Sequence, residues 1–191
     1  MKKNKKQVLK IMGIAFVVIL LAIWGTQVYR MNQKIPQVQT EVTEAREWFQ
    51  WKENVKLRTE GARFMENDEI RNLYRLDEDE TEPFPGMILK LMWVTVSFKN
   101  DSSESADIDI LDIGASTSGW SNIPDYDFYY KIGNPERPHH FELKPQEEVR
   151  MDLPYLFVKP NFRNGQWEKI EEKDYFLVTS LYPTKHMIKI E

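Results

Sequence analysis

The sequence predicts an all-β domain, an antiparallel β-sandwich, that follows one N-terminal transmembrane helix and has a short helix inserted near residues 66–76. Two observations support this prediction. Residues 11–28 carry no charge, and a helix of that length covers about 27 Å, close to the hydrocarbon thickness of a bilayer. After residue 86, short apolar segments alternate with turns rich in glycine, proline, asparagine and serine. Short strands without long amphipathic helices between them are typical of a sandwich.

Charge on the two sides of the apolar segment predicts its orientation. Lysines occupy positions 2, 3, 5, 6 and 10, and every acidic residue follows the segment. Because cytoplasmic flanks retain positive charge, we expect residues 1–7 to form a cytoplasmic tail and residues 8–29 to span the cell membrane, in contact with the lipid bilayer. The remainder of this single-pass chain is then extracellular.

A cleaved signal peptide is the alternative, because residues 11–24 have the length of its apolar region. The following residues, 25–30, lack the small-x-small pattern that a signal peptidase needs, and this favours a retained anchor. Both alternatives place the rest of the chain outside the cytoplasm.

Composition excludes several classes of protein. The chain has no cysteine, so a disulfide scaffold, a Cys-ligated zinc site and a thiol nucleophile are all ruled out. Residues 31–191 hold 20 Lys and Arg against 30 Asp and Glu, a formal charge of −10. Such a surface disfavours nucleic acid and anionic lipid as partners.

The exterior divides into a stalk, residues 30–43, and a sandwich domain, residues 44–191. Within the domain, Ile70, Leu73 and Tyr74 fall at helical spacing and predict the short helix. An acidic run at residues 77–82, closed by two prolines, is expected to be a solvated loop.

Residues 87–99 are the strongest strand prediction, because they are apolar on both faces and therefore belong in the middle of the domain. The alternation breaks at Leu111, which indicates a bulge or a strand end there. Residues 114–125 and 161–173 are expected to be irregular. The other strands expected after residue 86 cover residues 106–113, 126–132, 141–145, 149–154, 175–181 and 186–190.

Three segments carry a resemblance to a known family. They are WVTVSFKNDSS at residues 93–103, FELKPQEE at residues 141–148, and YFLVTSLYP at residues 175–183 followed by IKI at residues 188–190. Together they resemble the uncharacterised membrane-anchored extracellular Ig-like, or telokin-like, domains of Gram-positive bacteria. The resemblance implies an Ig-like sandwich tethered outside such a cell, and it brings no catalytic residues. The chain lacks the acylated cysteine of the lipoprotein members, which is consistent with a helical anchor.

The residues give no pattern for an enzyme. The chain has three histidines, and the adjacent His139 and His140 would point to opposite sides of an extended segment. The third, His186, lies beside a lysine in the last predicted strand, and no Gly-x-Ser-x-Gly motif is present. We therefore expect a non-catalytic protein that uses no cofactor.

Acidic side chains raise the question of a metal site. Asp107, Asp109 and Asp112 offer carboxylates along one segment, as do residues 77–82 and the pair Asp125 and Asp127. Calcium needs six to eight oxygens, which usually come from a loop that wraps the ion. We therefore favour solvated carboxylates and predict no metal site, while a weak divalent site at the first three aspartates stays open.

Aromatic residues are the remaining candidates. Trp120, Tyr126 and Phe128 lie in or next to the longest irregular segment, and Trp167 lies in a second loop. Exposed rings can stack on a sugar or a peptide, whereas rings in a strand usually pack in the sandwich. Packing is the favoured interpretation, and these four residues are the candidate binding residues if a surface exists.

These features predict a binding or accessory module of the cell envelope, whose partner is an envelope protein or a wall polymer. The alternative is a cell-wall-directed enzyme, or a receptor for a small ligand or a metal, with an unrecognised site. No sequence feature indicates an oligomeric state.

Overall fold

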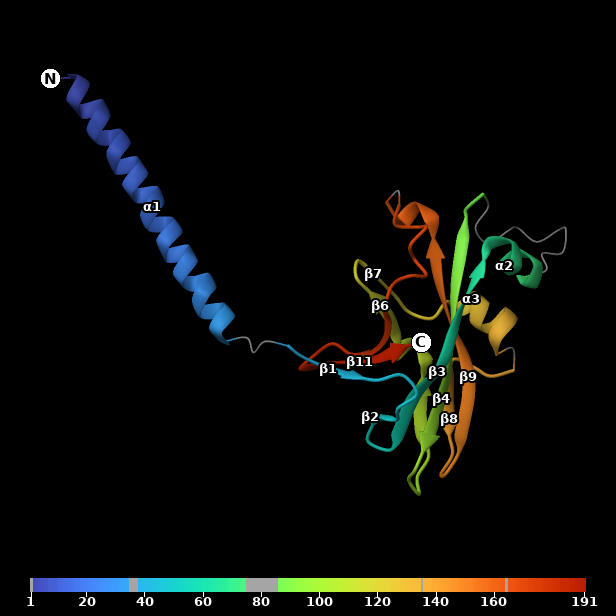
Figure 1. The fold of residues 1–191 in the computed structure, drawn as a ribbon. Helices are drawn as coiled ribbons and strands as arrows, with labels where there is room; N and C mark the ends of the chain where they lie inside the picture. Colours follow the sequence, from blue (N-terminus) through green and yellow to red (C-terminus); the bar gives the residue numbers. More distant parts are fainter. Residues whose placement is uncertain (1, 35–37, 75–85, 135, 164) are drawn as a thin grey trace. The chain divides into compact units, whose positions relative to one another are not determined.

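The computed structural model describes residues 2–34, 38–74, 86–134, 136–163 and 165–191 (Figure 1). The chain forms two compact units, Met1–Val38 and Gln39–Glu191. The predicted acidic loop at residues 77–82 lies outside the described residues.

The first unit is one long helix, α1 (Lys2–Lys34), which contains no proline or acidic residue. Within its segment Gln7–Lys34, an 18-residue window reaches a mean hydropathy of 2.5, sufficient for crossing a membrane. Its apolar side chains are exposed, including those of Ile14, Leu21 and Trp24. By length and composition the helix fits either a membrane anchor or a signal sequence, as the sequence predicted.

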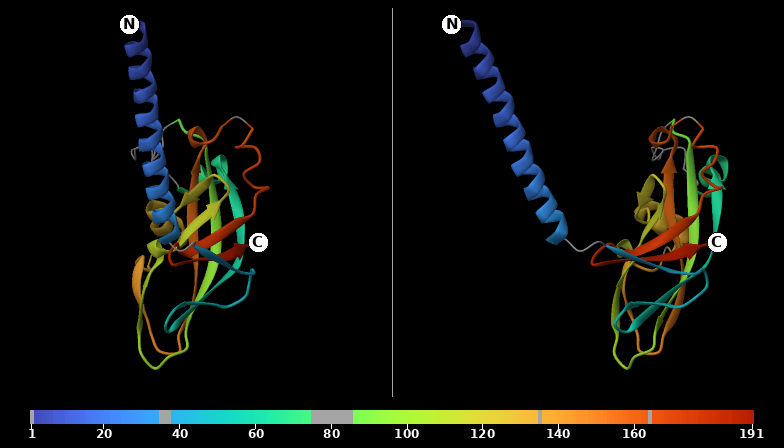
Figure 2. Two further views of the ribbon diagram at one scale, coloured as in Figure 1. Left: turned by 90° about the vertical axis from the view of Figure 1, so that its left-hand side faces the viewer. Right: turned by 60° about the vertical axis from the view of Figure 1, so that its left-hand side comes forward.

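The second unit is a β-sandwich, which confirms the predicted fold class. One sheet has the order β1-β11-β10-β6-β7, the other has the order β2-β3-β4-β9, and β5 pairs with β8. Figures 1 and 2 show the strands of the five-stranded sheet running obliquely across those of the four-stranded sheet. The strands are β1 (Gln39–Thr43), β2 (Phe49–Lys52), β3 (Val55–Glu66), β4 (Leu89–Asn100), β5 (Ala106–Asp109), β6 (Gly114–Thr117), β7 (Trp120–Asn122), β8 (His140–Leu143), β9 (Glu148–Val158), β10 (Tyr175–Ser180) and β11 (Thr184–Ile190).

The central position predicted for residues 87–99 is confirmed by β4, which pairs antiparallel with both β3 and β9. Val94, Val96 and Phe98 are fully buried on the face toward the five-stranded sheet, in the main core. Alternate residues point to the opposite face, where Leu91 and Trp93 are also buried.

The buried residues on that outer face form a second cluster. The covering elements are α2 (Asn67–Tyr74), which contributes Ile70, and α3 (Tyr126–Phe128), which contributes Phe128. This cover explains why β4 is apolar on both faces, since each face meets its own packing layer. The helix expected at residues 66–76 is confirmed by α2 within the described residues.

The stalk differs from its prediction, because residues 39–43 form β1. This strand pairs in parallel with β11, the last strand, from Gln39 against Thr184 to Thr43 against Ile188. The sandwich therefore begins at Gln39 rather than at residue 44, and its first and last strands share one ladder.

The strand predicted over residues 126–132 is wrong. The structure has α3 followed by a π-helical turn, η2 (Tyr129–Gly133). The carboxylate of Asp125 accepts a hydrogen bond from the backbone N–H of Phe128 and so caps the helical turn. Phe128 is then buried in the second cluster while Tyr129 is buried in the main core, so packing from both sides overrides the strand propensity of the aromatic run.

Two irregular regions also contribute structure. Residues 114–125, expected to be irregular, contain the hairpin β6–β7, with Gly119 at φ +82° in its turn. The strand break at Leu111 is confirmed as a strand end, because β5 is followed by a 3₁₀ turn, η1 (Ile110–Asp112). A second 3₁₀ turn, η3 (Lys159–Asn161), follows β9.

Candidate functional site

The four candidate aromatic residues do not share one surface. Phe128 is fully buried, and Trp167 is only 7% exposed, with its ring centroid 5.7 Å from that of Phe162. Trp120 is half-buried and stacks on Phe157, with ring centroids 4.0 Å apart and planes at 14°. These three rings pack in or beside the core, which is the interpretation that the sequence favoured.

Tyr126 is the exposed member, with 52% of its surface accessible. It opens α3, directly after the capping residue Asp125, whose carboxyl group has its pKa raised by burial. The backbone N–H of Asp125 also donates a 2.7 Å hydrogen bond to the carbonyl oxygen of Pro154 on β9. The exposed ring is therefore held on a turn that is fixed at two points.

Tyr126 belongs to an aromatic cluster with Tyr130 and His139. The ring centroid of Tyr126 lies 4.7 Å from that of Tyr130 and 5.3 Å from that of His139. The Tyr130 hydroxyl lies 3.0 Å from His139 Nδ1 and accepts a 2.9 Å hydrogen bond from the His139 backbone N–H. Hydrogen bonding with Tyr130 raises the pKa of Tyr126. About half of the Tyr126 surface stays accessible in this arrangement, and an exposed aromatic ring suits contact with a protein or a sugar.

A groove of about 820 Å³ lies elsewhere on the sandwich, lined by residues 111, 112, 114–116, 121–123, 178–182 and Lys185. Most of these residues belong to β6, β7, β10 and the turn into β11. Its volume falls in the range of small-molecule sites. We call its three exposed apolar residues the rim: Ile123 (51% exposed), Leu181 (69%) and Tyr182 (61%).

An irregularity in β10 contributes to this groove. The pairing of β10 with β11 shifts between Val178 opposite Met187 and Ser180 opposite His186, which leaves Thr179 without a counterpart. The hydroxyl of Thr179 is buried and has no hydrogen-bond partner in the described residues. Bulges of this kind end regular pairing and redirect side chains.

The groove contains two charged side chains with different surroundings. Asp112 Oδ2 lies 3.5 Å from Lys52 Nζ and is partly neutralised by it. Lys185 forms no ion pair with any carboxylate in the described part of the chain. Lys185 is therefore the unpaired charged side chain of the groove among the described residues, although residues 31–191 as a whole are acidic.

The aspartates considered for metal binding have other roles. Asp109 accepts a 3.0 Å hydrogen bond from the backbone N–H of Leu111, and Asp112 pairs with the lysine described above. Asp107 Oδ1 lies 4.0 Å from His140 Nε2. Across the described ranges, no three histidine, aspartate or glutamate side chains converge as a metal site would require.

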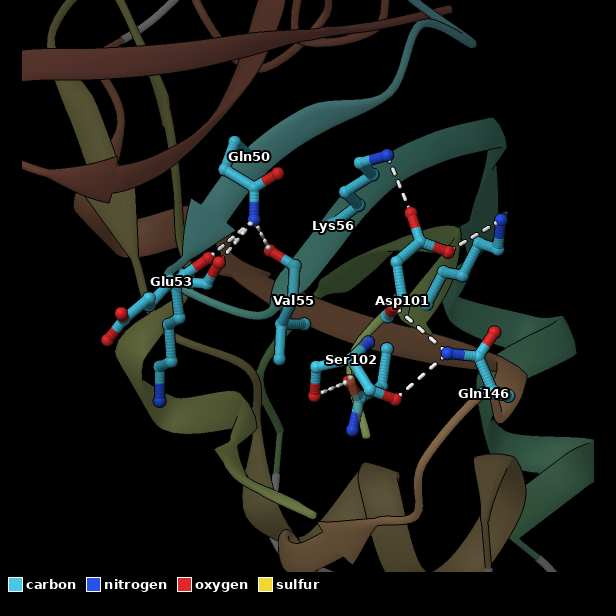
Figure 3. Close-up of polar contacts among 10 residues, drawn as sticks. Gln50, Glu53, Val55, Lys56, Asp101, Ser102 and Gln146 are labelled. Carbon is cyan, nitrogen blue, oxygen red and sulfur yellow. Dashed lines mark hydrogen bonds and ion pairs between the residues drawn. The ribbon is translucent and has the colours of Figure 1, made fainter. Parts of the chain in front are cut away.

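One end of the sandwich carries a dense set of polar contacts, shown in Figure 3. Asp101 pairs with Lys56 at 2.6 Å and with Lys99 at 2.7 Å, and these hydrogen bonds lower its pKa. Gln146 donates from Nε2 to the backbone oxygens of Asp101 and Ser102, both at 2.9 Å. Because these groups are engaged with one another, the set joins two turns and offers little to a ligand.

The groove could not be predicted from the sequence, because its lining comes from segments far apart in the chain. One local signal was present. Leu181 and Tyr182 directly precede Pro183 at a turn, where exposed polar residues are usual. Because residues 175–181 are predicted as one strand, Leu181 is expected to pack in the sheet, whereas β10 ends at Ser180 and Leu181 lies exposed in the turn.

Comparison with known proteins identifies a family but no activity. The sequence pattern described as "Domain of unknown function (DUF5028)" matches residues 26–186. No curated protein matches the chain.

Three solved structures are similar to it. An uncharacterised beta-sandwich protein from Clostridium difficile 630 has a TM-score of 0.45 at 11% identity, over 82% of this chain and 99% of that one. A conserved hypothetical protein from Bacillus anthracis has a TM-score of 0.45 at 16% identity, covering 78% and 95%. The yjhA protein from Bacillus subtilis has a TM-score of 0.44 at 11% identity, covering 78% and 99%. Since the family pattern spans most of its length, the chain belongs to the DUF5028 family.

Proposed function

We propose that this chain is a single-pass protein of a Gram-positive cell membrane, with a cytoplasmic N-terminus and an extracellular Ig-like sandwich that acts as a non-catalytic binding or accessory module of the cell envelope. The observation that carries the proposal is α1, an apolar helix with exposed side chains at the start of a sandwich domain. Burial of such an apolar surface in lipid is favourable, which supports the membrane anchor. The resemblance noted above supplies the Gram-positive context.

The contacts of the histidines support a non-catalytic role. His139 is engaged by the Tyr130 hydroxyl, His140 lies near Asp107, and the ring of His186 packs 5.2 Å from Phe49. No serine or threonine hydroxyl bonds to any of the three in the described residues, so the pairing that activates a hydroxyl nucleophile is not assembled there.

Topology can be tested directly because the natural chain has no cysteine. We would label Asn4→Cys and Ser103→Cys variants in intact cells with a membrane-impermeant maleimide. Ser103 lies in the exposed turn after β4 and should react, whereas position 4 should react only after lysis. Labelling of position 4 in intact cells would reverse the proposed orientation. A shorter mature chain that lacks α1 would show a cleaved signal sequence instead.

The aromatic cluster is the proposed contact for an envelope protein or wall polymer. In-cell crosslinking of the full-length chain, followed by mass spectrometry, would identify what it binds. Tyr126→Ala should lose the captured partner, and Tyr182→Ala is the matched control, since it removes another exposed tyrosine at the groove rim. Loss of the partner in the control alone would move the binding site to the groove.

A receptor for a small ligand is the second candidate, favoured by the groove of about 820 Å³ with Lys185 in its lining. It predicts that a small anionic compound, rather than a macromolecule, protects the groove. Retention of a compound by the purified chain, lost in Lys185→Gln, would support this candidate over the first.

A further inference from the structure

We propose that the rim of the groove, Ile123, Leu181 and Tyr182, rests in the outer headgroup layer of the membrane that holds α1. This inference rests on the proposed membrane anchor and identifies a lipid surface as a partner of the sandwich. Three properties of the chain support it: the length of the connection to α1, the apolar character of the rim and the charges around it.

The connection between the two units is short. Four residues, 35–38, separate Lys34 at the end of α1 from Gln39 at the start of β1. A fully extended chain of that length covers about 18 Å between the two Cα atoms. Whatever orientation the sandwich takes, the start of β1 is therefore held within that distance of the end of the helix.

The end of α1 lies close to the bilayer surface if residues 8–29 span the membrane. The helix continues five residues beyond Tyr29 to Lys34, a rise of about 8 Å. One headgroup layer is roughly 6 Å thick, taken from the difference between total and hydrocarbon thickness. The short connection thus starts near the outer edge of the headgroups.

Strand register places the rim beside this tethered end. Gln39 is directly opposite Thr184 in the β1–β11 ladder, and paired strands lie about 4.8 Å apart. Thr184 follows Leu181, Tyr182 and Pro183 in the turn from β10. Leu181 and Tyr182, the two most exposed side chains of the rim, therefore lie in the turn next to the start of β1, where the chain arrives from α1.

The side chains of the rim match the chemistry of a membrane interface. A leucine at 69% and a tyrosine at 61% exposure in one turn leave apolar surface in water, whereas amphipathic rings and leucines are favoured at the headgroup boundary. Ile123 extends the apolar surface across the mouth of the groove.

Local charge permits this contact although the exterior is acidic overall. Lys185 lines the groove beside the rim and pairs with no described carboxylate, so it is free to bind a lipid phosphate. The acidic lining residue, Asp112, is paired with Lys52. The negative charge of Asp112 is therefore partly neutralised, while Lys185 beside it carries an unpaired positive charge toward the headgroups.

Depth measurements on single-cysteine variants test the proposal in the full-length chain. We would attach an environment-sensitive fluorophore at Leu181→Cys, reconstitute the protein in phosphatidylcholine nanodiscs, and add lipids with a spin-label quencher near the headgroup. The matched control is Leu73→Cys, an exposed leucine (45%) on α2. Figure 1 shows α2 on the opposite side of the sandwich from the turn that precedes β11. A third probe, at Ile19→Cys in α1, reports on the anchor itself with a quencher near the bilayer centre.

We expect headgroup quenching and a blue-shifted emission at position 181, several-fold stronger quenching than at position 73, and deep quenching at position 19. Deep quenching at 19 with equal, weak quenching at 181 and 73 would overturn the inference and leave the anchor intact. A blue shift at 181 without lipid quenching would also overturn it, because a protein surface would then cover the rim. Absence of quenching at 19 would remove the anchor and the inference together. Each labelled variant should keep the tryptophan-fluorescence unfolding midpoint of the parent chain, since both leucines are largely exposed.

Discussion

Asn100 is a buried polar residue whose replacement tests the turn end of the sandwich. It is fully buried, and its Nδ2 donates to the backbone oxygens of Glu104 at 2.8 Å and Leu143 at 3.0 Å. Its Oδ1 accepts from the backbone N–H and the hydroxyl of Ser102, at 3.0 and 2.8 Å. A single amide thus joins the turn after β4 to the end of β8.

The cost of removing this side chain follows from these four hydrogen bonds. At a net 0.5–1.5 kcal/mol each, Asn100→Ala should reduce the free energy of unfolding by roughly 2–6 kcal/mol. Asn100→Asp keeps the shape and the two bonds at Oδ1, but it places a carboxylate oxygen against two carbonyl oxygens in a buried site. We therefore expect Asn100→Asp to be less stable than Asn100→Ala at neutral pH.

For Asn100→Asp we also predict how the free energy of unfolding depends on pH. Burial and the facing carbonyls would raise the pKa of the new carboxyl group in the folded state above its unfolded value. The loss in free energy of unfolding of Asn100→Asp, relative to the parent chain, should therefore be smallest below about pH 4. It should grow as the pH rises through the pKa of the carboxyl group in the folded state. Urea unfolding of the full-length chain in detergent, followed by tryptophan fluorescence, measures both quantities.

Ser102→Ala is the matched control in the same turn. It removes hydroxyl contacts at a partly exposed position and should cost less than about 1 kcal/mol. The reasoning would be refuted if Asn100→Asp were as stable as Asn100→Ala at neutral pH, or if its deficit did not change with pH. Either result would mean that the amide does not face these carbonyls in a buried site.

Two further predictions concern packing and charge. Trp120→Ala should lower the free energy of unfolding by about 3 kcal/mol because it removes a ring stacked on the core, whereas Tyr126→Ala should change it by less than about 0.5 kcal/mol. Unfolding midpoints in urea distinguish the two variants. Equal losses would mean that Tyr126 is a core residue. Lys90 is buried, which lowers its pKa, but hydrogen bonds with Glu171 and Glu66 outweigh burial and raise the pKa overall. Lys90→Met should change the free energy of unfolding by no more than about 1 kcal/mol, whereas Glu66→Gln combined with Glu171→Gln should cost about 2 kcal/mol because the buried ammonium loses its partners. Any stability that the parent chain gains over Lys90→Met should disappear as the pH rises above about 10.5. A stability difference that stays constant in urea titrations at alkaline pH would contradict this assignment.

The sequence predicted those elements whose signal is local. Residues 87–99 are apolar on both faces, and residues 89–99 of this segment lie in β4. Ile70, Leu73 and Tyr74 have helical spacing, and they lie in α2. The strand prediction for residues 126–132 was wrong because strand propensity describes a half-buried surface, whereas here consecutive residues pack into two different clusters. No periodicity within one segment can report that kind of packing.

The candidate sites were less predictable, because their residues are brought together by tertiary structure. The groove joins residues from positions 111 to 185, and its bulge at Thr179 depends on pairing with β11. The β1–β11 ladder was also missed. Residues 39–43 are almost entirely exposed along their length, so their pattern shows no buried face and resembles a linker.

The exposure of Tyr126 follows from the same packing that buries Phe128. The outer face of β4 carries Leu91 and Trp93, and a ring from α3 is needed to cover them. Residues two apart on a helical turn point about 200° from each other, so placing Phe128 inward directs Tyr126 to solvent. The hydrogen bond from the backbone N–H of Phe128 to the carboxylate of Asp125 fixes this phase. The candidate partner contact is thus a consequence of how the central strand is covered, which explains why two neighbouring aromatic residues of similar type have opposite roles.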